Sequence, residues 1–201
     1  MATKSGPPKK IMIIRHGEKP AQPPGKDGPF DVKENGEGGK GKSLIVIGWQ
    51  RAGALNAFFA PHKGKPVKKE IATPDYIYAA DPHGESQRPW ETVTPLAAWL
   101  GYKQGTPRFN THYDIGGGEG QLVQAVLGLS GTVLICWEHD NIMPNMVGAL
   151  NKMAPISNYR SMPPKWPDVF YLVWVFDLDS SGKKYVWSHC RQNLMAGDVK
   201  G

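Results

Sequence analysis

The feature of the sequence that most constrains the fold is a short apolar run at residues 10–14, which stops abruptly at Arg15-His16-Gly17-Glu18. A β-branched run of this length, ending in polar residues and glycine, is typical of a buried strand that delivers a loop at its carboxyl end. Ligands bind at that edge in open α/β sheets. An arginine there provides a fixed cation beside a histidine, and Gly17 lets the backbone approach a ligand closely. The pattern favours a ligand site, although a strand end with solvated polar residues would match it too.

Length and composition predict one globular domain over residues 1–201. The chain has a mass of 22.1 kDa, with 40% hydrophobic and 21% charged residues, which suits a single α/β domain with a sizeable core. No apolar run approaches the roughly 20 residues of a membrane span. The first eight residues lack the apolar centre of a signal peptide. We therefore expect a cytoplasmic protein with no membrane partner.

The net charge of +6 raises the question of nucleic-acid binding. The lysines gather at the N-terminus and in the connector 63–69, without interleaved aromatic residues and without a nucleic-acid-binding motif. We interpret them as solvated lysines and expect no nucleic-acid partner. A modest preference for anionic substrates is compatible with this charge.

Hydrophobic periodicity predicts alternating strands and helices along the rest of the chain. The strongest strand pattern after the first run is at 132–137, which ends at Glu138-His139-Asp140. Pro95 predicts a kink or an early break in its helix. The expected helices cover 52–59, 86–100, 120–129 and 142–150, and the expected further strands cover 76–80, 132–137, 169–177 and 184–191. The fold class that follows is an α/β three-layer sandwich, with a mostly parallel central sheet, helices on both faces and an edge hairpin near the C-terminus.

Residues 20–43 interrupt this pattern. The stretch is crowded with proline, glycine, lysine and acidic residues and has little to bury. A loop this long in a compact domain is usually a lid, a binding loop or disordered. Because it leaves directly from the first motif, we expect a mobile flap over the pocket, with plain disorder as the alternative.

Arg15-His16-Gly17 after a first hydrophobic strand resembles the histidine phosphatase superfamily, in particular the phosphoglycerate mutase-like branch and its small bacterial phosphatases. In that family the histidine of the motif is phosphorylated, while two arginines and a second histidine hold the phosphoryl group. The segment Arg88-Pro89-Trp90-Glu91-Thr92 is similar to the one that carries the second arginine. The second histidine follows a buried strand, where His139 matches it. The resemblance covers most of the chain.

The resemblance implies a metal-independent phosphomonoester hydrolase that acts through a phosphohistidine on His16. It implies that His16 and His139 are catalytic, and that Arg15, Arg88 and both histidines bind the phosphoryl group, the arginines in bidentate form. The substrate would be a small phosphorylated compound or a phosphoprotein. The histidines show no zinc-site spacing, and no nucleotide-binding glycine pattern occurs, so we expect neither a metal nor a cofactor.

The general acid has three candidates. In the acid phosphatase branch of the family it directly follows the second histidine, which points to Asp140. In the mutase branch it precedes that histidine, where Asp114 and Glu119 are available. We place Asp140 first because a strand fixes its position, although Asp140 or Asn141 could instead cap the following helix. Alternation along the strand predicts that Glu138 points away from the pocket.

Two other functions share the same motifs. Family mutases carry a longer insertion before the second histidine, and the interval of 51 residues between Arg88 and His139 leaves little room for one. A phosphoryl-binding module without turnover would keep the arginines but would not need His16 as a nucleophile. We therefore prefer a phosphatase to phosphoglycerate mutase-type transfer or to binding alone.

Overall fold

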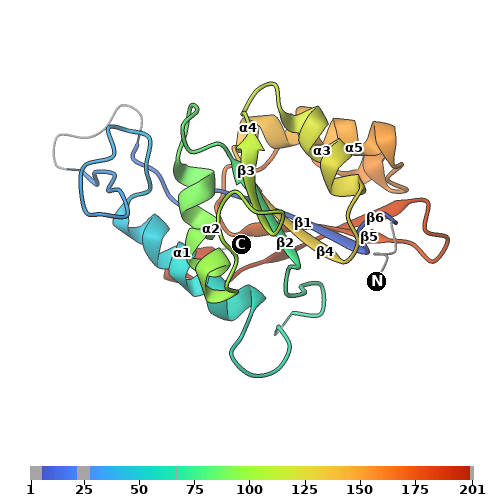
Figure 1. Cartoon of the computed structure of the whole chain (residues 1–201), viewed down its shortest axis with the longest axis horizontal. Helices are drawn as coiled ribbons and strands as arrows, with labels where there is room; N and C mark the ends of the chain where they lie inside the picture. The colour runs from blue at the N-terminus through green and yellow to red at the C-terminus, as the bar shows by residue number, and fades with distance from the viewer. Residues whose placement is uncertain (1–5, 22–27, 67, 200–201) are drawn as a thin grey trace.

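The computed structural model describes residues 6–21, 28–66 and 68–199, and within them six strands form one open sheet (Figure 1). The strand order is β3-β2-β4-β1-β5-β6. The first four of these pair in parallel, and β5 and β6 form an antiparallel hairpin along one edge. The bounds are β1 (Lys10–Arg15), β2 (Tyr76–Ala80), β3 (Phe109–Tyr113), β4 (Thr132–Trp137), β5 (Leu172–Leu178) and β6 (Tyr185–Arg191).

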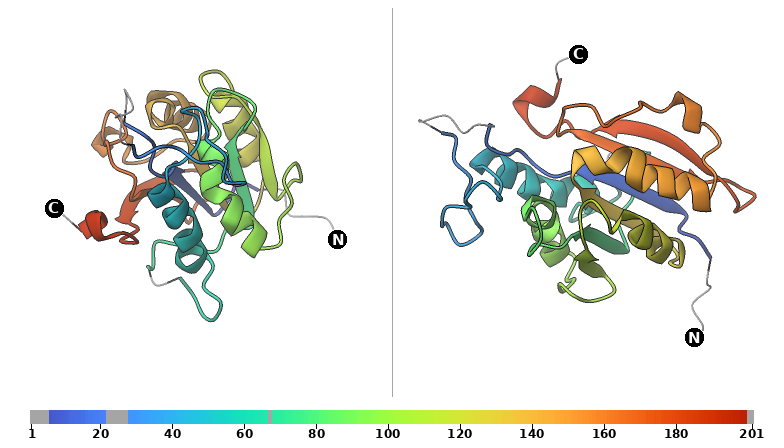
Figure 2. Two further views of the ribbon diagram at one scale, coloured as in Figure 1. Left: turned by 90° about the vertical axis from the view of Figure 1, so that its left-hand side faces the viewer. Right: turned by 90° about the horizontal axis from the view of Figure 1, so that it is seen from above.

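Helices cover both faces of this sheet, which confirms the predicted three-layer α/β sandwich. On one face lie α1 (Val46–Phe59) and α2 (Arg88–Trp99), and on the other α3 (Glu119–Leu127) and α5 (Val147–Met153) (Figure 1). The turned views of Figure 2 show the same layering. None of the helices in the described ranges combines the length and apolarity needed to cross a bilayer.

The two sides of β1 explain why its sequence is apolar without interruption. Ile11 and Ile13 pack into the core beneath α3 and α5, whereas Met12 and Ile14 pack into the core beneath α1 and α2. A parallel strand covered on both faces buries every side chain, so it shows a continuous hydrophobic run in place of alternation. The same burial applies to β4, its parallel neighbour.

Four elements differ from the sequence-based expectation. Helix α1 begins at Val46, six residues before the expected start at residue 52. Strand β3 was not predicted, because its alternating polar residues Asn110 and His112 suit an exposed edge of the sheet. Helix α2 continues through Pro95 without an early break. The single helix expected over 142–150 is instead a short α4 (His139–Asn141), an irregular turn at Ile142–Met146 and then α5. Met143 is extended there, as expected for the residue before Pro144.

The loop after β1 packs directly against the start of α1. The Glu18 carbonyl accepts a hydrogen bond from the Ile45 N–H at 3.1 Å. A Cβ atom on Gly48 would lie 2.5 Å from the Glu18 carbonyl oxygen and 3.0 Å from the Glu18 nitrogen. Because both neighbours are backbone atoms, only glycine permits this approach. The helix start therefore fixes the position of the loop that carries His16.

We expect Gly48→Ala to lower the free energy of unfolding by about 1–3 kcal/mol, because the added methyl group pushes α1 away from the loop. Gly53→Ala in the same helix is the matched control, since a Cβ there meets no atom within 4 Å. It should raise the free energy of unfolding by about 0.5–1 kcal/mol through helix propensity. Urea unfolding of both variants measures the difference, and equal stabilities would contradict the steric argument.

Candidate active site

The side chain of His16 is completely buried at the carboxyl end of β1. Its backbone N–H donates to the Trp137 carbonyl at 3.2 Å, which continues the pairing of β1 with β4. The ring nitrogen Nδ1 lies 2.7 Å from the Gly17 carbonyl oxygen. Since a carbonyl can only accept, Nδ1 carries the proton in this contact, and we assign the tautomer on that basis. The lone pair is then on Nε2, a buried atom that has no hydrogen-bond partner in the part of the chain that the structure describes.

The surroundings of His16 keep its ring neutral. Burial lowers the pKa of His16 well below its ordinary value of 6.5, and the positive charges of Arg15, Arg88 and Lys19 lower it further. The hydrogen bond to Gly17 opposes this shift without outweighing it. A neutral imidazole with a free Nε2 has the form that a nucleophile or a general base requires.

The guanidinium of Arg15 is buried, with 1% of its side chain exposed. Its Nη1 donates to Asp168 Oδ1 at 2.7 Å, and its Cζ lies 4.1 Å from the centre of the Phe170 ring. The Nε–H of Arg15 is buried and has no partner among the described residues. Nε is one of the two donors of the side-on arrangement that guanidinium groups form with carboxylates and phosphates, so Arg15 keeps a free donor of that kind.

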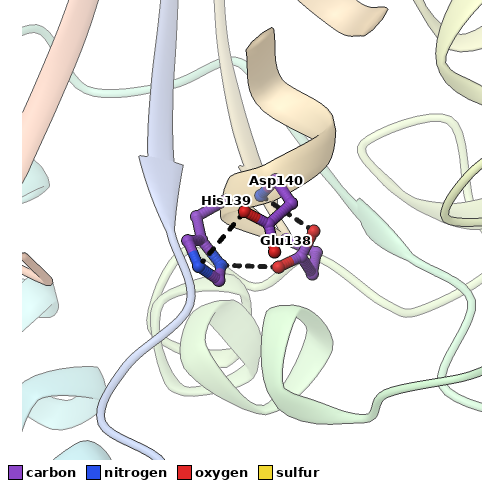
Figure 3. Close-up of side chains that lie close together, drawn as sticks. All are labelled: Glu138, His139 and Asp140. Atoms are coloured by element: carbon purple, nitrogen blue, oxygen red, sulfur yellow. Dashed lines mark hydrogen bonds and ion pairs between the residues drawn. The ribbon is translucent and has the colours of Figure 1, made fainter. Parts of the chain in front are cut away.

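His139 lies across the site from His16, with ring centroids 6.4 Å apart and ring planes at 87°. Its Nδ1 is 2.5 Å from Glu138 Oε1, and its Nε2 is 3.5 Å from Asp140 Oδ1 (Figure 3). Neither contact has the alignment of a hydrogen bond, and each is an ion pair only when the ring is protonated. The two carboxylates thus flank the ring.

The prediction that Glu138 points away from the pocket is wrong. Strand β4 ends at Trp137, and α4 begins at His139, so alternation does not extend across Glu138. The Oε2 atom of Glu138 accepts from the backbone N–H groups of Asp140 and Asn141. Glu138 is therefore the N-cap of α4, a role that we had considered for Asp140 or Asn141.

Arg88 is the first residue of α2, two residues after the expected start of that helix, and its orientation differs from the expected one. Its Nε donates to the Ser43 carbonyl at 3.4 Å, and its Nη2 donates to the Gly41 carbonyl. Its side-on edge is therefore occupied by the loop and not turned to an open phosphate site. Its charge still reaches the site, because it contributes to the lowered pKa of His16.

The buried polar atoms without partners concentrate in this site. Among the described residues five such side-chain atoms occur, and three of them are Arg15 Nε, His16 Nε2 and His139 Nδ1. The last of these is the atom in close but unaligned contact with Glu138. Buried polar groups in folded proteins are nearly always partnered, so each exception requires an explanation. A polar ligand that contacts these residues would provide one.

The three candidates for the general acid differ in their surroundings. Glu119 is buried, and its Oε1 accepts from the Gly116 N–H at 2.7 Å and from Trp137 Nε1 at 3.0 Å. Its hydrogen bonds thus stabilise the start of α3. Asp114 is exposed in the loop before α3. Asp140 lies beside His139, with its Oδ1 3.5 Å from the ring nitrogen Nε2 and 82% of its side chain exposed.

Glu138, His139 and Asp140 also form a group in which three ligand atoms lie within 4.8 Å of one another, so they could hold a metal ion. One oxygen of Glu138 is already committed to the N-cap of α4. Arg88 interacts electrostatically with Glu138, and this positive charge disfavours a second cation. We therefore interpret the cluster as a support for the ring of His139.

The first turns of α2 hold the loops around the site. Thr92 Oγ1 accepts from the Gly17 N–H at 2.8 Å, and Glu91 Oε2 accepts from the Leu44 N–H at 2.8 Å. Asp31 is buried, and its Oδ2 accepts from the Ser43 N–H at 2.9 Å. Within the stretch expected to be a flap, residues 31–43 are therefore tied to α2, whereas residues 22–27 lie outside the described residues.

A scan of the sequence against protein-family models finds no match, and a search among curated proteins gives no match either. The assignment of the site therefore depends on its geometry and on the resemblance of its motifs.

Glu91 provides a test of these loop contacts. Burial raises its pKa to about 6 from an ordinary value of 4.5, and its side chain is 1% exposed. The folded state thus favours the protonated form of Glu91 more than the unfolded chain does. Ionising Glu91 in the folded protein therefore lowers the free energy of unfolding. This reduction is absent below pH 4.5, develops as the pH rises to 6, and reaches about 2 kcal/mol at higher pH.

We expect Glu91→Gln to remove this pH dependence while keeping an acceptor for the Leu44 N–H. The stability of the variant relative to the unmodified protein should rise by about 1–2 kcal/mol between pH 4.5 and pH 6.5. Denaturant unfolding at a series of pH values measures it. Glu34→Gln, at an exposed position in the stretch 31–43, controls for the change in net charge. A relative stability that is constant with pH would contradict the assignment.

Proposed function

We propose that the protein is a metal-independent phosphomonoester hydrolase that forms a phosphohistidine on Nε2 of His16. The observation that carries this proposal is the state of His16: it is buried and neutral, its Nδ1 is held by the Gly17 carbonyl, its Nε2 has no partner among the described residues, and the charge of Arg15 acts on the ring. The resemblance of the motifs to the histidine phosphatase superfamily supports the same chemistry. The substrate would be a small phosphorylated compound or a phosphoprotein.

The charges around His16 suit phosphoryl transfer. In the transition state negative charge spreads over the three equatorial oxygens of the phosphoryl group, so catalysis depends on positive charge fixed in advance. Arg15 offers an Nε–H that has no partner among the described residues, and Arg88 acts on the same site through its charge. His139 lies across the site from His16 and would donate a hydrogen bond to a phosphoryl oxygen. Guanidinium groups keep their charge when buried, which a lysine in the same place would not do reliably.

The proposed reaction has two steps. The Nε2 lone pair of His16 attacks phosphorus, the bond to the leaving oxygen breaks, and the Asp140 carboxyl gives its proton to that oxygen. The Asp140 carboxylate then takes a proton from water, whose oxygen attacks the phosphohistidine and releases inorganic phosphate. His16 regains its lone pair. The exposure of Asp140 favours hydrolysis over mutase-type transfer, since a mutase must exclude water from the phosphoenzyme.

We expect His16→Ala to abolish phosphatase activity, with a loss of at least about 10³-fold in kcat, and to leave the protein folded. The exposed His189 on β6 provides the control, and His189→Ala should retain activity. Labelling with a ³²P-phosphomonoester should give an acid-labile, base-stable phosphoenzyme in the unmodified protein only. Activity that disappears with a chelator and returns with a divalent ion would refute the metal-independent mechanism.

We expect Asp140→Asn to slow hydrolysis in a manner that depends on the leaving group. A poor leaving group such as an alkoxide needs the proton, so the loss there should be about 10²-fold or more, whereas 4-nitrophenyl phosphate should lose less than about fivefold. Asp114→Asn and Glu119→Gln are the matched comparisons at the other two candidate positions. Asp140 is excluded as the acid if its variant treats both substrates like the unmodified protein.

A further inference from the structure

A hollow of about 610 Å³ adjoins the candidate active site. It shares Asp168 and Phe170 with that site, because the first accepts a hydrogen bond from Arg15 and the second lies against its guanidinium. The Phe170 ring is also 6.0 Å from the ring of His16. A molecule whose phosphoryl group lies at His16 could therefore extend into the hollow.

Apolar side chains form most of the wall of this hollow. They come from three separate parts of the chain: the first turn of α1, the segment before β5, and the C-terminal turn. Ile47 in α1 is 49% exposed, although it is a large aliphatic residue. The apolar residues of the wall include Ile47, Val169, Phe170, Tyr171, Met195 and Ala196. Such a wall beside a polar centre is typical of a site for the apolar part of a ligand.

The charged residues of the wall are already paired. The guanidinium of Arg51 donates to Glu18 at 2.6 Å and to Asp198 at 2.7 Å. Asp168 is bound by Arg15. Two carboxylates therefore face the Arg51 guanidinium, and the third carboxylate of the wall faces the guanidinium of Arg15. A second anionic group of a substrate would lose its hydration there without meeting an unpaired cation of the wall.

The hollow is formed before any ligand binds. Asp198 Oδ2 accepts from the N–H groups of Leu194 and Met195, and its pairing with Arg51 fixes the C-terminal turn against α1. Arg51 and Asp198 are both buried. A wall held by a buried ion pair of this kind needs little ordering when a ligand enters, which favours binding.

We propose that this hollow binds the apolar, ring-bearing alcohol part of a phosphomonoester that carries no second anionic group. This inference rests on the proposed function, because that function identifies the substrate as a phosphomonoester. Flat apolar rings suit the wall because Phe170 and Tyr171 offer aromatic faces. A quaternary ammonium group would find those same faces, but the carboxylates that it would need are paired with arginines.

The first test compares four aryl phosphates with the unmodified protein. We expect kcat/KM for 2-naphthyl phosphate to exceed that for phenyl phosphate about tenfold, through the additional buried ring. The value for 4-(carboxymethyl)phenyl phosphate should fall about tenfold below that for phenyl phosphate. An anionic ester that equals phenyl phosphate, or a 4-(trimethylammoniomethyl)phenyl ester that exceeds the naphthyl ester, would overturn the proposal.

Variants of two adjacent residues localise the effect. Ile47→Asp should remove the preference for the naphthyl ester, and Ile47→Lys should reverse the order of the carboxymethyl and phenyl esters. Val46→Asp is the matched control, because Val46 is also in the first turn of α1, is 59% exposed and does not line the hollow. It should change all four values less than twofold. Equal effects at positions 46 and 47 would refute the assignment.

A binding measurement separates this inference from the proposed function. We expect calorimetry to show that 2-naphthol binds the unmodified full chain. Its dissociation constant should be at least fivefold higher for Ile47→Asp and should differ by less than twofold for Val46→Asp. If no ester is hydrolysed but this pattern is observed, the proposed hydrolase function fails and the apolar site is retained. If the protein hydrolyses the esters with no preference for the naphthyl ester, and if 2-naphthol binds Ile47→Asp as tightly as the unmodified protein, the proposed function is retained and the inference is overturned.

Discussion

The parallel pairing of β1 with β4 is the interaction on which the candidate site depends. Its register places Arg15 opposite Trp137, so the residues that follow the two strands emerge side by side at one edge of the sheet. His16 follows the first strand and His139 the second, and their rings come to lie 6.4 Å apart. A slip of the register by one residue would turn the side chains of β1 to opposite faces and expose its apolar residues to the wrong core. Core packing and site geometry therefore have a common cause.

Helix α2 adds a second constraint, because it binds both loops that border the site. Thr92 holds Gly17, and Arg88 donates to the carbonyl groups of Gly41 and Ser43. On the proposed function, a phosphoryl group that takes the side-on edge of Arg88 must displace those carbonyl groups. Binding of the substrate and the position of residues 41–43 would then be coupled through a single guanidinium. The sequence predicts a flap over the site. The contacts of Arg88 with the carbonyl groups of Gly41 and Ser43 indicate that such a flap would respond to the binding of a phosphoryl group.

The elements that the sequence predicted well are those whose burial leaves a continuous or periodic signal. Strands β1 and β4 and the C-terminal hairpin are of this kind, whereas β3, an edge strand with polar alternation, gives a weak signal. The positions of Arg15, His16 and His139 followed from strand ends. Glu138 was misplaced because alternation fails where a strand passes directly into a helix. The pairing of Asp168 with Arg15 spans 153 residues, and no local pattern encodes it.

That pairing explains how the site can hold a buried cation in its resting state. An isolated guanidinium that is almost fully buried would be costly, and Asp168 offsets part of that cost. The carboxylate itself is 91% exposed, so solvent screens its charge, while Arg15 lowers the pKa of Asp168 and keeps it ionised. The pair is thus strong enough to orient Arg15 through Nη1 and too well solvated to cancel its field. The remaining charge of Arg15 still lowers the pKa of His16. On the proposed function, the Nε–H that has no partner among the described residues would donate to an oxygen of the phosphoryl group.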